Sequence, residues 1–276
     1  MIVEPADVSR NRNTGILVNR PHILLTNDDG IQAPGLLALA EALSGIARLS
    51  IVAPEHNWSA AGHTKTMHKP LRVEAVTLPH AGKALVTSGS PSDCVAMALL
   101  GLIEERPDLV VSGINLGANV GHDLTYSGTV AAAMEAVIAG VSAIAVSLDS
   151  YEAADCRPAA RFATILAQRV LASRSPMPLL LNVNVPALPQ EAIRGVHITR
   201  LGRRLYRDAL VPRRDPRGRL YYWIGGDPPA GIPEEGTDIG ALAQGYISVT
   251  PIRLDLTDYE ELETLKEWEL TFPERD

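Results

Sequence analysis

Short apolar runs, separated by longer amphipathic or alanine-rich stretches, make up most of this 276-residue chain. Such runs predict strands buried on both faces of a parallel sheet, and the longer stretches predict the helices that connect them. Because strands keep alternating with helices, we expect an α/β fold with a Rossmann-like, mostly parallel sheet, right-handed crossovers and helices on both faces. The central apolar runs are residues 23–25, 49–53, 109–111, 141–148 and 179–185.

The sequence also indicates where other elements begin. Two further short strands are expected at 71–76 and 83–87, and helices at 34–43, 94–103, 127–137 and 159–171. Ser90, Pro91 and Asp93 make a favourable helix start, since they combine a cap, a proline in the first turn and an acid near the positive end of the helix dipole.

The character of the sequence changes after Pro186. Arg, Tyr and β-branched residues around the turn 215–218 predict a long hairpin over 195–225, followed by a loop-rich segment, a strand at 246–249 and an acidic helix at 259–270. We expect the C-terminal hairpin and helix to be used for oligomerisation, because protruding elements often make subunit contacts. The hairpin arginines are expected on a solvated or interfacial face: Arg203, Arg204, Arg207, Arg213 and Arg214.

These changes divide the chain into three predicted segments. Residues 1–20 are polar and are expected to be a flexible leader. Residues 21–186 are expected to form the Rossmann-like catalytic core. Residues 187–276 are expected to add the C-terminal hairpin, strand and helix to the same domain.

Composition narrows the class of protein. The chain is 46% hydrophobic and 21% charged, as in soluble globular proteins, and its net charge of −7 argues against a nucleic-acid partner. No apolar run is long enough to span a membrane and no signal peptide is recognisable, so we expect a cytoplasmic protein without a membrane partner. Cys94 and Cys156 lack the spacing of a disulfide framework or metal site, and are expected to be buried thiols.

Candidate chemistry begins with the loop after the first strand, which contains Asp28, Asp29 and Gly30. In an open α/β sheet, ligands bind outside the carboxyl ends of the strands. Gly30 permits the turn that would let both carboxylates face one ligand, and carboxylate oxygens suit Mg²⁺ or Mn²⁺. Taken alone, the acids could equally be ordinary turn and cap residues.

The loop after the second strand is expected on the same side of the sheet. Its Ser59 could be a hydroxyl ligand or a helix cap, and position alone favours the cap. His56, His63 and His68 do not have the helical i, i+4 spacing of a zinc site, so we expect them to be solvated loop histidines.

A third loop, 112–123, is rich in glycine and amides, and Asn115 and Asn119 offer oxygens to a cation and N–H donors to phosphate. Ser127, Gly128 and Thr129 then open an alanine-rich helix, where free backbone N–H groups and hydroxyls could bind an anion. A structural turn and ordinary capping remain the alternatives for these two segments.

Four motifs in this order resemble the SurE (survival protein E) family of metal-dependent 5′/3′-nucleotidases. They are ILLTNDDGI (23–31), SGSPSDCVAMAL (88–99), SGINLGANVGHDLTYSGTVAAA (112–133) and EEGTDIGALAQGYISVTPIRLDLT (234–257). The resemblance implies that Asp28, Asp29, Ser59 and Asn115 are metal ligands, and that Asn119, Ser127, Gly128 and Thr129 contact phosphate and substrate. It also implies a homodimer or homotetramer joined through the C-terminal hairpin and helix.

We therefore expect a phosphomonoesterase with one divalent metal ion, Mg²⁺ or Mn²⁺, in each subunit. Its substrates would be nucleoside 5′- and 3′-monophosphates, and short polyphosphate would be a further one, with Asp28 and Asp29 as the catalytic carboxylates and water as the attacking group. One departure from the family is the loop 57–62, NWSAAG, which replaces the family's Arg-Ser-Gly. The alternatives are a Rossmann-type nucleotide-binding protein, which the missing Gly-x-Gly-x-x-Gly disfavours, and a metal-stabilised scaffold without activity.

Overall fold

A nine-stranded sheet organises the described part of the chain, which is residues 20–79, 82–152, 154–173, 175–268 and 270–272 of a computed structural model. The predicted leader, residues 1–20, lies outside these ranges except for Arg20. In order across the sheet, the strands are β3 (Val73–Leu78), β4 (Gly82–Thr87), β2 (Arg48–Pro54), β1 (His22–Thr26), β5 (Leu109–Leu116), β6 (Ala143–Asp149), β7 (Leu180–Pro186), β11 (Ile247–Pro251) and β8 (Val196–Ile198).

The sheet is mostly parallel, which confirms the predicted α/β class. The six strands from β4 to β7 in the sheet order run in one direction. Antiparallel pairing occurs towards the two edges, between β3 and β4 and between β7 and β11. The carboxyl ends of β2, β1 and β5 therefore meet at one edge of the sheet, where ligands bind in open α/β folds.

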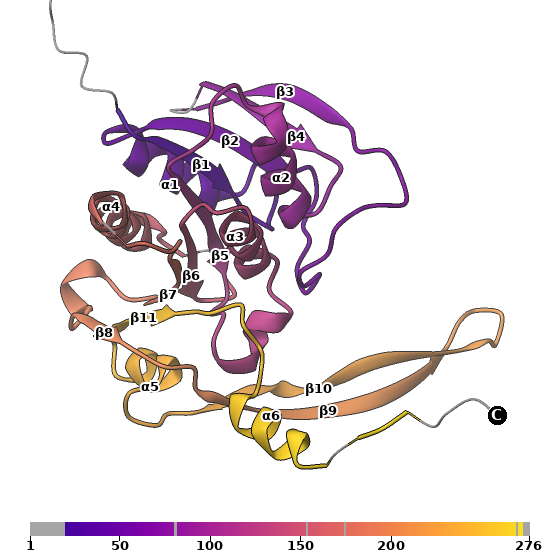
Figure 1. The fold of residues 1–276 in the computed structure, drawn as a ribbon. Coiled ribbons are helices and arrows are strands. Elements are labelled where there is room, and N and C mark those ends of the chain that lie inside the picture. Colours follow the sequence, from indigo (N-terminus) through magenta and orange to yellow (C-terminus); the bar gives the residue numbers. More distant parts are fainter. Residues whose placement is uncertain (1–19, 80–81, 153, 174, 269, 273–276) are drawn as a thin grey trace, which may run out of the picture.

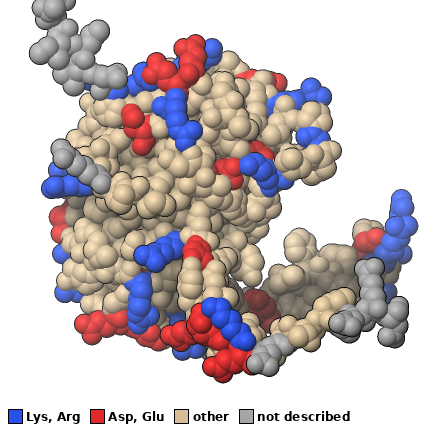
Figure 2. Space-filling view, viewed as in Figure 1, with Lys and Arg blue, Asp and Glu red and all other residues tan. Residues whose placement is uncertain are grey.

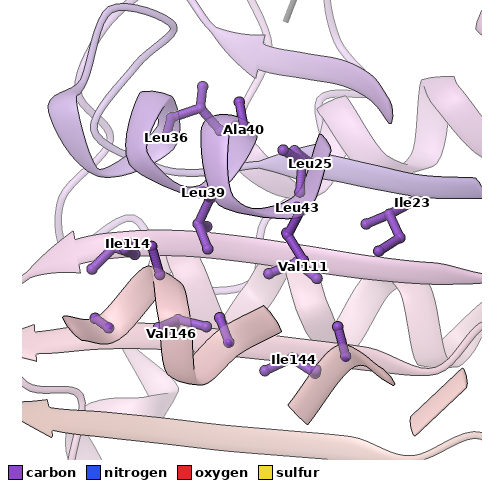
Figure 3. Close-up of a cluster of buried hydrophobic side chains, with 14 of the residues drawn as sticks. Ile23, Leu25, Leu36, Leu39, Ala40, Leu43, Val111, Ile114, Ile144 and Val146 are labelled. Atoms are coloured by element: carbon purple, nitrogen blue, oxygen red, sulfur yellow. The ribbon is translucent and has the colours of Figure 1, made fainter. Parts of the chain in front are cut away.

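Helices cover both faces of the sheet, as predicted (Figure 1). On one face lie α1 (Pro34–Ser44) and α4 (Arg157–Ala172), and on the other α2 (Pro91–Met97) and α3 (Gly128–Ile138). Strand side chains alternate between the faces: Ile23 and Leu25 pack in the cluster under α1, and Leu24 in the cluster under α2 and α3. In Figure 3, Leu39 and Leu43 of α1 reach down to the sheet. Burial of each such leucine contributes roughly 1.5–3 kcal/mol.

The C-terminal segment contains the predicted hairpin and helix. Strands β9 (Arg203–Arg214) and β10 (Leu220–Ile232) pair antiparallel and extend away from the sheet (Figure 1), and α6 (Tyr259–Lys266) follows β11 along the chain. The space-filling view shows the hairpin as an arm that leaves the body, with an open notch between the two (Figure 2). Within the described residues, no helix combines the length and hydropathy needed to cross a membrane.

Several element boundaries differ from the prediction. Strand β5 continues through residues 112–116, where a loop was expected, because these residues pair with β6. The segment 226–245, expected to be loop-rich, contains the end of β10 and the helix α5 (Asp238–Ala243). The short strand β8 was not predicted; it is held by pairing with β11, a contact between segments far apart in the sequence.

Candidate active site

The eight predicted site residues come from three neighbouring strand ends and one helix start. Asp28 and Asp29 follow β1, and Ser59 lies in the loop after β2. Asn115 is the second-to-last residue of strand β5, and Asn119 lies in the loop that follows this strand. Ser127, Gly128 and Thr129 begin α3. The topology therefore gathers them at one edge of the sheet.

Asp28 is a buried carboxylate held by the first turn of α3. The Thr129 hydroxyl donates a hydrogen bond to Asp28 Oδ1, and the Asp28 carbonyl accepts one from Trp58 N at 2.8 Å. Burial raises the pKa of Asp28 above its ordinary value, and the hydrogen bonds from Thr129 only partly oppose the rise. Thr129, which is itself fully buried, thus directs its hydroxyl to Asp28.

Asp29 is joined to Ser59 through Asn57. Asn57 Nδ2 donates to Asp29 Oδ1 at 3.1 Å, while Asn57 Oδ1 accepts from both the backbone N–H, at 2.7 Å, and the hydroxyl of Ser59. Burial and the neighbouring charge of Asp28 raise the pKa of Asp29 to about 6. Asn57 was not predicted as a site residue, although the Asn-x-Ser spacing is a local signal for such a turn.

Gly128 lets α3 approach Asp28 closely. A Cβ at this position would lie 2.7 Å from the Asp28 Cβ and 2.9 Å from its Oδ2. Ser127 is the N-cap, and its Oγ accepts from Val130 N at 3.1 Å. The positive end of the helix dipole is therefore directed at the carboxylate and at the space beside it.

The two asparagines of the third loop are fixed differently. Asn115 Nδ2 donates to Gly117 O at 2.7 Å, and its Oδ1 accepts no hydrogen bond among the described residues. Asn119 Nδ2 donates to Ser147 Oγ at 2.8 Å, and Asn184 Oδ1 accepts from the Asn119 backbone N–H at 2.8 Å. Asn184 thus positions the loop from β7, a strand end that the sequence argument did not connect with the site.

A cavity of about 330 Å³ brings most of these groups together. This volume lies at the lower end of the range for small-molecule sites, about 300–1,000 Å³. Of the predicted residues, those that line it are Asp28, Ser59, Asn115, Asn119 and Ser127. Asp29 is linked to the cavity through Asn57, and Gly128 and Thr129 lie behind Asp28.

The available donors fit a hard divalent cation. Two adjacent carboxylates, a hydroxyl and an amide oxygen are ligands that Mg²⁺ and Mn²⁺ prefer. Among the described residues, neither Asp28 nor Asp29 forms an ion pair, so no protein cation compensates their burial. In the same part of the chain no three His, Cys, Asp or Glu side chains cluster as a metal site, which disfavours a zinc-type ligand set.

One loop histidine has a partner that was not predicted. His63 is exposed, as expected, but its Nε2 lies 3.1 Å from the buried carboxylate of Glu135 on α3, which also pairs with Lys65 Nζ at 2.7 Å. A pairing across 72 positions has no local signal in the sequence. His56 and His68 are exposed, as expected. The contact to Glu135 ties the loop that carries Ser59 to the helix that holds Asp28.

The base of the hairpin also reaches the site. Asp123, which lines the cavity, pairs with Arg204 Nε at 2.7 Å and accepts a hydrogen bond from the Tyr206 hydroxyl. Arg204 is therefore largely buried, in contrast to the solvated or interfacial face expected for the hairpin arginines. The cavity is further lined by Tyr126 and Tyr151, which sequence reasoning did not select because aromatic residues in loops carry no spacing signal.

Comparison with known proteins adds independent evidence on the family of this chain. A family model described as survival protein SurE matches residues 23–208. A relative from Chloroflexus aggregans, named 5′-nucleotidase SurE, is 53% identical over 252 residues, which are 90% of this chain and 99% of that protein. One of the same name from Herpetosiphon aurantiacus is 51% identical over 88% of this chain and 96% of its own length. The crystal structure of the SurE protein from Aquifex aeolicus superposes with a TM-score of 0.77 at 40% identity, covering 90% of this chain and 100% of that one.

Proposed function

The chain belongs to the survival protein SurE family, and on this basis we propose that it is a divalent-metal-dependent nucleotidase, a phosphoric monoester hydrolase. It hydrolyses nucleoside 5′- and 3′-monophosphates to nucleoside and phosphate, with short polyphosphate as a further substrate. The observation that carries the proposal is Asp28, a buried carboxylate without an ion pair among the described residues, in a cavity beside the start of α3. The alternative of a Rossmann-type binding protein or silent scaffold is not favoured by the relatives.

We assign the metal ligands to Asp28, Asp29, Ser59 and Asn115, for one Mg²⁺ or Mn²⁺ in each subunit. When bound, the ion polarises the phosphoryl group and makes a water molecule acidic enough to attack at neutral pH. The protein holds its own ligands in place: Thr129 fixes Asp28, and Asn57 keeps Asp29 and Ser59 together.

We assign the phosphate-binding role to the third loop and the helix start. Ser127, Gly128 and Thr129 form the start of α3, where backbone N–H groups and the helix dipole favour an anion, and Asn119 lines the same cavity as Ser127. Negative charge that develops on the phosphoryl oxygens is stabilised there by groups already oriented before reaction, which avoids the cost of reorganisation.

Phosphate release from 5′-AMP, 3′-AMP and an aryl phosphate tests this function, measured with Mn²⁺, with Mg²⁺ and with chelator. We expect release that needs metal and is faster for the nucleotides than for the aryl phosphate. A folded, metal-loaded sample that releases no phosphate from any of them would contradict the proposal.

We propose that the enzyme is a homodimer or homotetramer joined through the hairpin and α6. Both elements expose large apolar side chains, among them Trp223 and Ile224 on β10 and Leu262 and Leu265 on α6. Exposed apolar patches of this kind mark interaction surfaces. Light scattering after size-exclusion chromatography should give a multiple of the chain mass, and replacing Trp223 and Ile224 together by Ser should reduce it.

The proposal also covers the location of the protein in the cell and the division of its chain. We propose a cytoplasmic enzyme, supported by Cys94 and Cys156, both buried and unpaired, as suits a reducing compartment. Residues 21–186 are assigned to the catalytic core and residues 187–276 to a C-terminal part of the same domain. Fractionation of cells that express the chain tests the location.

A further inference from the structure

Two tyrosine side chains beside the cavity have no part in the phosphate chemistry. Residues 21–200 contain four Phe, Trp or Tyr residues, and two of these, Tyr126 and Tyr151, line this one cavity. They are 61% and 76% exposed. Single exposed aromatic residues are common and need no explanation. Two of them at one ligand cavity, in a segment otherwise poor in aromatic residues, make a local apolar surface.

The Tyr151 ring is placed by the loop that carries the assigned ligands. Gly117 lies between Asn115 and Asn119, and a Cβ on Gly117 would lie 2.7 Å from Tyr151 Cε1. Gly117 also has φ +110°, a conformation that side chains rarely adopt, so the position stays open for the ring. Among the described residues, the Tyr151 hydroxyl has no hydrogen-bond partner, and the ring lies against Gly117.

Tyr126 is placed by the helix start. It directly precedes Ser127, the N-cap of α3, and its carbonyl accepts a hydrogen bond from Gly62 N at 2.9 Å. Both tyrosines therefore have a defined position relative to the groups assigned to metal and phosphate. The cavity is thus lined both by the polar groups around Asp28 and by the side chains of Tyr126 and Tyr151.

Charged side chains that could recognise the edge of a base by hydrogen bonding are scarce in the cavity lining. The described lining contains no Lys or Arg, and the acid nearest the tyrosines in sequence, Asp123, is engaged by Arg204 and Tyr206. A ligand group beside the tyrosines would meet aromatic surface. Aromatic surface binds nucleobases by stacking and tolerates all of them, because every base has a π face.

We propose that Tyr151, with Tyr126 lining the same cavity, is a stacking platform for the nucleobase of the substrate. This inference rests on the proposed nucleotidase function and adds a structural reason for the enzyme to prefer nucleotides over other phosphomonoesters. The enzyme accepts all common bases, with a modest preference for purines, and discriminates against phosphomonoesters that lack a base. Loss of one stacked ring weakens binding about 5- to 150-fold, from roughly 1–3 kcal/mol per base and 1.36 kcal/mol per tenfold.

The test compares Tyr151→Ala and Tyr151→Phe with wild type on 5′-AMP and ribose 5-phosphate, which differ by the base. We expect Tyr151→Ala to lower the ratio of kcat/KM for 5′-AMP over ribose 5-phosphate about 5- to 150-fold, mainly through KM. Tyr151→Phe retains the ring and should keep the ratio within about twofold of wild type. An unchanged ratio in Tyr151→Ala, or an equal loss on both substrates, would overturn the inference.

Binding of adenosine separates this inference from the proposed function, because adenosine has no phosphate. Saturation-transfer NMR should show signals from the adenine protons with wild type and Tyr151→Phe, and strongly reduced signals with Tyr151→Ala. If wild type hydrolyses neither substrate, the proposed function fails, and the adenosine signals still decide on the platform. Equal adenosine signals in all three proteins would exclude Tyr151 as the platform.

Discussion

At the scale of single residues, the site places two carboxyl groups where burial disfavours their ionised form. Asp28 is buried beside Asp29, and the pKa values of both carboxyl groups are raised by burial. Because the folded pKa of Asp28 lies above the unfolded one, its ionised form lowers the free energy of unfolding at neutral pH, and this penalty disappears as the pH falls below the unfolded pKa. Without a bound cation, the two carboxylates proposed as metal ligands therefore lower the stability of the protein.

Replacing Asp28 by Asn should separate these two effects. The amide keeps the shape and can still accept the hydrogen bond from Thr129, but carries no charge. We expect turnover to fall more than about 100-fold, since loss of even one oxyanion donor costs about 10²–10³. In chelator at pH 7, the variant should melt higher than wild type, by about 2–4 °C for each kcal/mol of relieved penalty. Near-normal turnover, or a lower melting temperature, would contradict the assignment.

How much of the site the sequence predicts depends on how local each contact is. Asp28, Asp29 and Asn115 follow from polar residues that end apolar runs, because strand ends of a parallel sheet share an edge. The roles of Thr129 behind Asp28 and of Glu135 beside His63 are set by contacts across 101 and 72 positions. No local pattern encodes these contacts, so they appear only once the chain is folded.

At the scale of elements, helix starts carry much of the organisation. The predicted N-terminus of α2 is a capping box in which Ser90 and Asp93 satisfy each other's backbone N–H groups. Asp93 also accepts from the backbone N–H of Thr66 at 2.9 Å and from its hydroxyl. The box therefore anchors the loop that follows Ser59 as well as starting the helix.

Asp93→Asn should destabilise the protein in a pH-dependent way. Burial raises the pKa of Asp93, but the hydrogen bonds from Thr66 and Ser90 outweigh it and lower the pKa below its ordinary value. The carboxylate thus contributes stability that is present above pH about 4 and is lost as the pH falls through its folded pKa. Urea unfolding should show a loss of about 1 kcal/mol at pH 7 and a smaller one at pH 3. An equal loss at both pH values would argue against the ionised cap.

Gly128→Ala tests the close approach of α3 to Asp28. The new Cβ would collide with the Asp28 side chain, so the carboxylate must shift. We expect kcat to fall at least about tenfold, since a displacement of 1 Å can cost about 10²-fold. Gly45→Ala is the matched control: Gly45 ends α1, has φ −69°, and has no atom within 4 Å of an added Cβ. Steady-state kinetics should show a lower kcat for Gly128→Ala than for Gly45→Ala. Equal kcat values for the two variants would refute the packing argument.

Element prediction succeeded where periodicity is long or capping is explicit. The parallel strands and the four main helices follow from apolar runs and from starts such as Ser90 and Ser127. Helix α5 and strand β8 were not predicted, because each is a few residues long and depends on partners brought together by the fold. Strand β5 ran further than expected because pairing with β6 overrides the turn preference of its Gly and Asn residues.

At the scale of the whole molecule, Asp238 joins the C-terminal segment to the site. Its buried carboxylate accepts hydrogen bonds from Gly121 N at 2.9 Å, Gly202 N at 2.7 Å and Ile239 N at 2.8 Å. Gly121 lies between Asn119 and Ser127, and Gly202 precedes the hairpin. One side chain thus fixes the cavity loop, the base of the hairpin and the start of α5 together.

Asp238→Asn should therefore affect both stability and activity. The amide NH₂ would face a backbone N–H, so at least one bond is lost inside the protein, at a cost of about 1–3 kcal/mol. We expect a lower melting temperature and a lower kcat, since the cavity loop loses its support. Asp258→Asn serves as the control, because Asp258 caps the exposed helix α6 and Asn is an equally good cap. Thermal melts and kinetics measure both, and an unaltered Asp238→Asn protein would refute the coupling.

The same link has a consequence for biosynthesis. A ribosome makes the chain from its N-terminus, and the core strands can begin to fold while later residues are still inside the synthesis machinery. The carboxylates at positions 28 and 29 emerge early, whereas the side chain that closes the loop at Gly121 arrives some two hundred residues later. A nascent chain that ends before Asp238 therefore carries its proposed metal ligands without a finished cavity, and catalysis becomes available only after Asp238 has been made and has folded against the loop.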